Sequence, residues 1–170
     1  LVEDKIESTY QRRETLINVL FVCLGNICRS PMADGVFQNM VKGAGLSDQI
    51  HIDSAGTAGY HVGETAHRGT LKTLKKNGIN YTGRSRQLQH PDFEKYDYIL
   101  AMDEDNLATI RSRMPANTQA TIRLFLDYAD SIKTREVPDP YYNGRFDEVY
   151  DLVLAGSQGL LEAIRQEHNL

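Results

Sequence analysis

Two cysteines, an arginine and a serine fall within eight consecutive residues near the start of the chain. Cys23 follows a short apolar run, and Arg29 stands six positions later. A thiolate can attack an electrophilic centre, and a guanidinium fork can bind two oxygens of a tetrahedral anion. The spacing therefore predicts a site that binds and attacks such an anion. A metal site through Cys23 and Cys28 is the weaker alternative, because two thiols alone make a poor ligand set.

The residues after Cys23 are suited to a tight loop that leads into a helix. Gly25 permits close backbone approach, and Asn26 tolerates a left-handed conformation. Ser30 can cap the helix, with Pro31 at its first position. The positive end of that helix and the arginine favour an anion and a thiolate, to which Ser30 could donate a hydrogen bond. The alternative is that Cys23 is only a small buried residue that closes a strand.

The rest of the chain alternates short apolar runs with amphipathic segments, which predicts an α/β fold. We expect a three-layer sandwich, in which a parallel sheet of four strands has helices on both faces. Because ligands bind at the carboxyl ends of such strands, Cys23 stands where a site is expected. The expected strands are 17–22, 50–53, 98–102 and 121–125, and 54–57 is expected to be a small flexible segment. The expected helices are 31–44, 66–77, one capped by Asp103, and a final one that carries Val149 to Ile164, after a loop over about 127–145.

Composition narrows the possible classes of function. The 170 residues carry 19 basic and 23 acidic side chains, a net charge of −4, so no basic field indicates nucleic-acid binding. No apolar run approaches the roughly 20 residues that span a bilayer. The N-terminus lacks a signal-peptide pattern, and two cysteines in one motif favour a reducing, cytoplasmic setting. We expect residues 1–15 to be an N-terminal extension, either frayed helix or disordered, and 16–170 to be a single domain.

Four segments together resemble the low-molecular-weight protein tyrosine phosphatase family. They are 23–31 (CLGNICRSP), 53–57 (DSAGT), 97–103 (DYILAMD) and 137–142 (VPDPYY). The resemblance covers the chain from about residue 16 to the last helix. It implies a four-stranded parallel sheet, no metal or other cofactor, and hydrolysis of phosphotyrosine in proteins and of small aryl phosphates. Tyrosine-phosphorylated proteins would be the partners, without nucleic acid or membrane, and the chain would be a monomer or weak dimer.

The resemblance also implies roles for individual residues. Cys23 would be the nucleophile, Arg29 the phosphate clamp and Asp139 the general acid; otherwise Asp139, between two prolines, would be a turn residue. Asn26 would hold the loop's shape and Ser30 would stabilise the thiolate. The substrate-binding residues would be Leu24, Gly25, Asn26, Ile27, Cys28 and Ser30 on the loop, with aromatic walls from Tyr60, Tyr141 and Tyr142. Packing of Tyr142 in the core is an equal alternative to its wall role.

Several points stay open at the level of sequence. Cys28 is either a buried loop residue or a disulfide partner of Cys23. Animal members of the family carry a histidine that supports the loop, at a position matched here to Asn77. His61 and His67 are taken as solvated loop residues, with a place lining the cleft as the alternative. Rival functions are a thioredoxin-coupled arsenate reductase, which needs further cysteines, an arginine phosphatase, which usually has threonine where Ile27 stands, and a non-catalytic phosphotyrosine-binding module.

Overall fold

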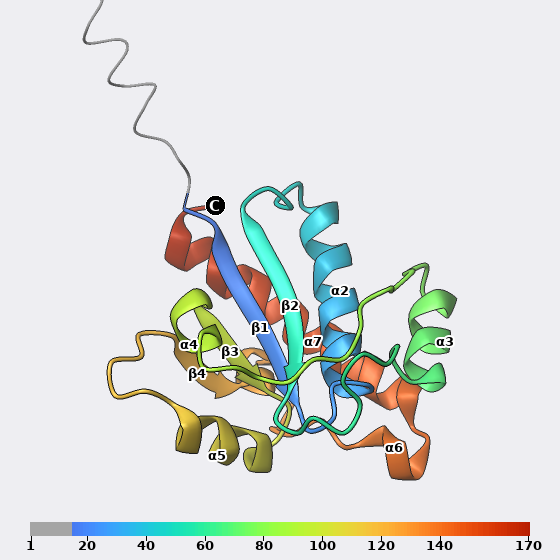
Figure 1. Cartoon of the computed structure of the whole chain (residues 1–170). Helices are drawn as coiled ribbons and strands as arrows, with labels where there is room; N and C mark the ends of the chain where they lie inside the picture. The colour runs from blue at the N-terminus through green and yellow to red at the C-terminus, as the bar shows by residue number, and fades with distance from the viewer. Residues whose placement is uncertain (1–14) are drawn as a thin grey trace, which may run out of the picture.

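The architecture is a parallel sheet between two layers of helices (Figure 1). A computed structural model describes residues 15–170, so the predicted extension, except for residue 15, lies outside the described residues. The sheet has the order β2-β1-β3-β4, and every pairing is parallel, which confirms the predicted fold class. Its strands are β1 Ile17–Cys23, β2 Ile50–Gly56, β3 Tyr98–Ala101 and β4 Thr121–Leu124.

The helices follow the strands as crossovers, which is why the sheet is parallel. Three short helices were not predicted, α4, η1 and α6, and α6 lies inside the expected loop over about 127–145. None of the helices in the described range combines the length and the apolar character that a membrane crossing needs. The helices are α2 Arg29–Gly43, α3 Arg68–Lys76, α4 Asp92–Lys95, α5 Glu104–Arg113, the 3₁₀ helix η1 Phe125–Tyr128, α6 Pro140–Asn143 and α7 Phe146–His168.

Strand β1 is buried on both faces because it lies inside the sheet. Phe21 points into a core shared with α2 and α7, where its ring packs edge-on against Phe37 and Phe125. Leu20 and Val22 point into the opposite core, under α5. This double burial explains the uninterrupted apolar run that predicted the strand. It also fixes the backbone from which the Cys23 side chain projects.

The order of the strands reverses at β1, since β2 and β3 lie on its two sides. Crossovers therefore leave in opposite directions there, and the ends of the loops separate to form a crevice. Figure 1 shows the carboxyl ends of the strands meeting the start of α2, with α5 and α6 at the same edge. The fold thus places Cys23, the last residue of β1, at this crevice.

Three local predictions are wrong and two are confirmed. Residues 54–56 belong to β2, and Ser54, Ala55 and Thr57 are buried, because this end of β2 packs beneath the loop that follows β1. Ser30 is not the cap of α2, which starts one residue earlier with Cys28 at the capping position, so Pro31 is not its first residue. Asp103 does cap α5 by accepting from the backbone N–H of Asn106. Asn26 has the left-handed backbone expected of it, with φ +56°.

Candidate active site

The loop between β1 and α2 turns its carbonyl groups away from the crevice. Five of these carbonyl oxygens accept hydrogen bonds of 2.8–3.0 Å from surrounding segments. With the carbonyls held outside, the peptide N–H groups face the other way. In the described part of the chain, the backbone N–H groups of residues 25–28 donate to no protein acceptor. The pairs are Thr57 N–Cys23 O, Ala58 N–Leu24 O, Ser85 Oγ–Gly25 O, His67 N–Ile27 O and Thr70 Oγ1–Cys28 O.

Asn26 braces the loop from below. Its φ is +56°, the left-handed conformation expected from its residue type. The Oδ1 atom accepts from the backbone N–H of Arg86 at 2.9 Å. The Nδ2 atom donates to Ser30 Oγ at 2.8 Å and to Ser54 Oγ at 2.9 Å. The side chain thus ties the loop to α2, to β2 and to the segment after α3.

The Cys23 sulfur lies next to the Ser30 hydroxyl, with 3.1 Å between Sγ and Oγ. Ser30 Oγ accepts from Asn26, so its own proton can go to the sulfur or to the Ala55 carbonyl at 3.4 Å, and the sulfur is the nearer of the two. Cys23 and Cys28 are both free and buried. Burial raises the pKa of the Cys28 thiol to about 12, and nearby Cys23 and Asp139 add to this effect. Cys28 is therefore a neutral thiol across the physiological range.

Arg29 lies beneath the crevice with only 3% of its surface exposed. Its Nη1 donates to Asp103 Oδ2 at 2.6 Å and to the Val137 carbonyl at 3.1 Å. Its Nη2 lies 3.5 Å from Asp139 Oδ2. Burial alone would lower the pKa of the guanidinium, but the anionic groups around it raise that pKa overall. A fixed positive charge therefore stands under the loop in a chain that is acidic overall.

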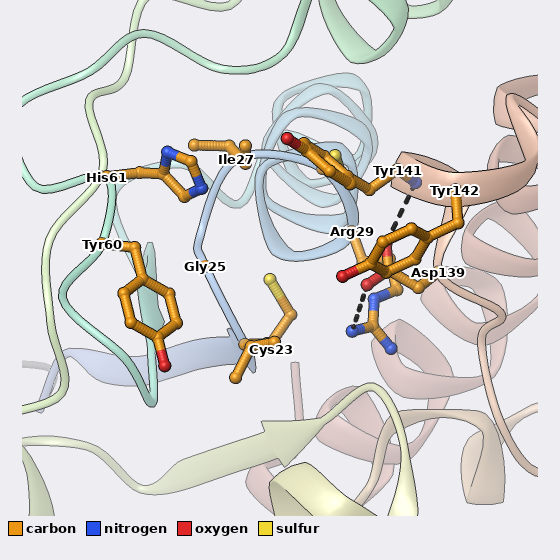
Figure 2. Close-up of a pocket in the computed structure, with 11 residues that line it drawn as sticks. Cys23, Gly25, Ile27, Arg29, Tyr60, His61, Asp139, Tyr141 and Tyr142 are labelled. Carbon is orange, nitrogen blue, oxygen red and sulfur yellow. Dashed lines mark hydrogen bonds and ion pairs between the residues drawn. The ribbon is translucent and has the colours of Figure 1, made fainter.

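Asp139 faces Arg29 from the far side of the crevice. It caps the short helix α6, where its Oδ1 accepts from the backbone N–H of Tyr141 at 3.0 Å. Its other oxygen is the one near Arg29, as the dashed lines in Figure 2 show. Asp139 is thus both a turn residue and a residue that contacts the site. The cap orients the carboxyl group and leaves Oδ2 directed toward the crevice.

These groups share one cavity of about 210 Å³ (Figure 2). Every predicted site residue lines it except Asn26 and Ser30, which lie underneath and contact the loop instead. The floor carries the Cys23 sulfur and the rim carries the aromatic rings. The lining residues are Cys23, Leu24, Gly25, Ile27, Cys28, Arg29, Tyr60, His61, Asp139, Tyr141 and Tyr142.

The three predicted wall tyrosines stand on the surface around the cavity. Tyr60 is 77% exposed, Tyr141 54% and Tyr142 84%. The alternative that Tyr142 packs in the core is therefore wrong. Tyr141 packs edge-on against Tyr142, with ring centres 5.2 Å apart, and against His67 at 5.9 Å. The aromatic side chains form one contiguous group on the α6 side, and Tyr60 stands opposite (Figure 2).

Neither histidine beside the site is simply solvated, contrary to the prediction. His61 lines the cavity, and its Nδ1 lies 2.7 Å from Glu64 Oε2. His67 caps α3 by accepting from the backbone N–H of Gly69, and its ring stacks on Phe146 with centres 5.0 Å apart. Single histidines in loops carry no periodic pattern, so only the packing of the loops could assign these contacts.

Asn77, whose match to the supporting histidine left its role open, makes no hydrogen bond to the loop. Its side chain is exposed and donates to the Thr73 carbonyl at 2.8 Å, which closes the end of α3. The residues that do support the loop were missed because they come from segments distant in sequence. Only for Asp103 does the sequence indicate a place near the loop, because Asp103 follows a strand expected to lie in the same sheet as β1. The missed contacts with the loop and with Arg29 come from Ser54, Thr70, Ser85, Arg86 and Asp103.

The crevice offers no ligand set typical of a metal site. Within residues 15–170, no group of three or more histidine, cysteine or acidic side chains is placed to hold a metal ion. Metal sites in proteins usually use three or four such ligands. The arrangement instead combines a sulfur nucleophile, a guanidinium, inward peptide N–H groups and a carboxyl group. This set of groups is suited to binding an oxyanion and to transferring that group to the sulfur.

Comparisons with known proteins agree with this geometry. The family model for "Low molecular weight phosphotyrosine protein phosphatase" matches residues 18–170. The low molecular weight protein-tyrosine-phosphatase YfkJ of Bacillus subtilis is 43% identical over 91% of this chain and 100% of its own length. Its crystal structure superposes with a TM-score of 0.87, at 44% identity, over 91% of this chain and 98% of that one.

Two further proteins are also similar to this chain. The low molecular weight phosphotyrosine protein phosphatase of Schizosaccharomyces pombe is 46% identical over 87% of this chain and 97% of its own. A crystal structure of a Drosophila arginine phosphatase superposes with a TM-score of 0.81, at 30% identity, over 86% of this chain and 97% of that one. The chain therefore belongs to the low molecular weight phosphotyrosine protein phosphatase family.

Proposed function

We propose that the chain hydrolyses phosphotyrosine in proteins, and small aryl phosphates, through a phosphocysteine intermediate. One observation carries the proposal: the Cys23 sulfur, Arg29 and the Asp139 carboxyl group line a single cavity whose rim is aromatic. Family membership supports the same activity. The match over residues 18–170 also supports a single phosphatase domain over 16–170.

In the first step, the Cys23 thiolate attacks phosphorus and the bond to the aryl oxygen breaks. Asp139, protonated, gives its proton to that oxygen, so tyrosine leaves as a neutral phenol. The inward N–H groups of the loop and the Arg29 fork bind the three remaining phosphate oxygens. Fixed donors of this kind stabilise developing charge without having to reorganise. The product of this step is a thiophosphate ester on Cys23 and an ionised Asp139.

In the second step, water attacks phosphorus and the bond to sulfur breaks. The Asp139 carboxylate takes a proton from that water, which regenerates the acid for the next cycle. The Cys23 thiolate is the leaving group, and a hydrogen bond from Ser30 at 3.1 Å stabilises its charge. Inorganic phosphate then leaves the loop. The cycle needs no metal ion or redox partner.

The rim accounts for the choice of an aryl ester. Tyr60 and the Tyr141–Tyr142 pair stand on opposite sides of the entrance, where they can contact both faces of a phenyl ring (Figure 2). Aromatic contacts of this kind contribute about 0.5–1.5 kcal/mol each. Ile27 adds apolar surface to the wall. A phosphoserine side chain is too short to reach the sulfur and the rim together.

The test compares three substrates and one variant. We expect the wild type to hydrolyse p-nitrophenyl phosphate and phosphotyrosine peptides, and phosphoarginine peptides more slowly. Cys23→Ser should lose at least about 10⁴-fold in kcat, because the nucleophile is removed. Persistent activity in that variant would overturn the mechanism. A preference for phosphoarginine would instead assign the specificity named for the Drosophila neighbour.

A further inference from the structure

A buried carboxyl group lies under the loop and takes no part in the proposed chemistry. Asp34, on α2, is only 3% exposed. Its Oδ1 accepts from Gln38 Nε2 at 2.6 Å, and its Oδ2 accepts from the Tyr81 hydroxyl at 2.8 Å. Burial raises the pKa of this carboxyl group to about 6, although the two hydrogen bonds lower it. A buried acid is costly to retain unless hydrogen bonds compensate for the lost solvation.

The connections lead to the nucleophile. The Tyr81 hydroxyl lies 3.4 Å from Ser54 Oγ, and Ser54 Oγ accepts from Asn26 Nδ2 at 2.9 Å. The second amide proton of Asn26 goes to Ser30 Oγ, which stands 3.1 Å from the Cys23 sulfur. A continuous chain of hydrogen bonds therefore runs from the carboxyl group to the sulfur. Asn26 is the branch point.

The directions of these hydrogen bonds are determined by the two ends. The backbone N–H of Arg86 can bond only to Oδ1 of Asn26, so Nδ2 faces the two serines. An ionised Asp34 can only accept hydrogen bonds, so the Tyr81 hydroxyl donates to it. The Tyr81 oxygen in turn accepts a hydrogen bond from the Ser54 hydroxyl. Ser54 then presents only lone pairs to Asn26. Each amide proton of Asn26 has an acceptor, and the Ser30 proton is left for the sulfur at 3.1 Å, which lies nearer than its other acceptor, the Ala55 carbonyl at 3.4 Å.

The place of Tyr81 depends on a glycine two residues later. A Cβ atom at Gly83 would overlap the Tyr81 hydroxyl and ring. The Tyr81 ring is also in ordinary contact range of the position that a Cβ on Gly35 would take, on α2. Small residues on both sides thus leave the slot that the ring fills. The slot holds the hydroxyl between β2 and α2.

We propose that Tyr81 and Asp34 are positioning residues: through Ser54 and Asn26 they hold the Ser30 hydroxyl as a donor to the Cys23 sulfur. The proposal rests on the proposed role of Cys23 as nucleophile and deepens it. Neither residue lines the cavity, so neither contacts the substrate. Their effect should fall on the ionisation of the sulfur and on kcat, and leave KM almost unchanged.

The negative charge of Asp34 and its place in the hydrogen-bond chain have opposite expected effects on the Cys23 thiolate, so an experiment can separate them. The groups that face Asp34 are Gln38 on its own helix, Tyr81, and Ser54 and Asp53 on β2; Asp53 is paired with Arg86. As a bare negative charge, Asp34 would disfavour the thiolate. As the end of the hydrogen-bond chain, it favours the thiolate. Removing the Tyr81 hydroxyl breaks the chain and keeps the charge.

The experiment measures the pH midpoint of Cys23 alkylation by iodoacetamide, together with kcat and KM for p-nitrophenyl phosphate. In Tyr81→Phe we expect the midpoint to move to higher pH and kcat at pH 7 to fall about 3- to 10-fold, with KM within about twofold. The high pKa of Cys28, about 12, keeps its thiol from titrating in the same range. An unchanged midpoint with unchanged kcat would overturn the proposal.

Two further variants separate this effect from others. Tyr128→Phe removes a buried hydroxyl that has no hydrogen bond to the loop, and should change neither readout. In Asp34→Asn, a midpoint that falls, with Tyr81→Phe unchanged, would assign the effect to charge and overturn the proposal. If Tyr81→Phe does not fold, Ser54→Ala breaks the next hydrogen bond and should give the same shift. Alkylation needs no turnover, so the proposed phosphatase activity and this inference can fail separately.

Discussion

The two sides of the cavity are built in opposite ways. On the floor, residues 26–28 of the loop after β1 are buried, and the loop's carbonyls and side chains are bonded to four other segments. On the rim, the tyrosines stand exposed on a short helix and a surface loop, and Asp139 beside them is half-buried. The floor makes its bonds inside the protein, whereas the rim leaves its side chains to solvent.

The difference corresponds to the two parts of the proposed reaction. Stabilising an oxyanion requires donors that are already in place, because moving them during the reaction would cost free energy. Recognition of different tyrosine-bearing surfaces gains from side chains that can adjust their rotamers. The two sides meet at the 3.5 Å contact between Arg29 and Asp139, which an incoming phosphate would compete for. Variants of the floor and variants of the rim should therefore lose different properties of the enzyme.

The largest expected effect comes from the acid on the rim. Asp139→Asn keeps the capping oxygen but cannot protonate the leaving group, so kcat should fall about 10²–10⁴-fold for esters of poorly acidic phenols. The loss should shrink for p-nitrophenyl phosphate, whose leaving group needs less help. A series of substituted phenyl phosphates measures this dependence. An equal loss across the whole series would contradict the assignment.

The buried acid under the floor should affect stability. The folded-state pKa of Asp34, about 6, is raised above the ordinary 3.8, so the folded state retains this proton over the interval between them. Its contribution to stability is present below pH 3.8 and is lost as pH rises through 6, by up to about 3 kcal/mol. Urea unfolding from pH 4 to 7 should show this loss in the wild type relative to Asp34→Asn. Parallel pH profiles for the two proteins would rule it out.

The packing of the floor leaves no room at Gly56. A Cβ there would stand 2.7 Å from the Leu24 carbonyl oxygen and 3.1 Å from the Asn26 backbone nitrogen. Gly56→Ala should therefore lower the free energy of unfolding by about 1–3 kcal/mol and reduce kcat as the loop shifts. Gly43→Ala, where a Cβ meets nothing within 4 Å, is the matched control. Chemical denaturation of both variants measures the difference, and equal stabilities would contradict it.

The smallest effects should come from the aromatic rim. Tyr141→Ala should lower kcat/KM for phosphotyrosine peptides about 2- to 10-fold, and Tyr142→Ala less, because Tyr142 is the more exposed ring. Inhibition by inorganic phosphate, which contacts only the floor, should stay unchanged in both. Peptide kinetics and phosphate inhibition together separate the two sides. Weaker phosphate inhibition in these variants would show that the rim also shapes the floor.

Much of this organisation was predictable from local patterns. The site could be placed at a sheet edge without any tertiary contact. The indications are the apolar run 17–22, the thiol at its end and the arginine six residues later. The capping role of Asp103 was predicted, but its ion pair with Arg29 was not. The prediction that residues 54–57 are flexible is wrong, because a run of small residues is equally compatible with a loop and with a buried strand end.

The sequence by itself determined the order of the elements, the nucleophile-bearing loop and the acid that follows a proline, because these depend on residue types at short spacing. Only the tertiary structure decided what supports them. Asn26 reaches Arg86, and Tyr81 reaches Asp34, across 60 and 47 positions of chain. Such contacts depend on how crossovers bring strands and helices together, and a single sequence holds no local signal for them. That is why the sequence leaves the role of Asn77 open and does not indicate Tyr81.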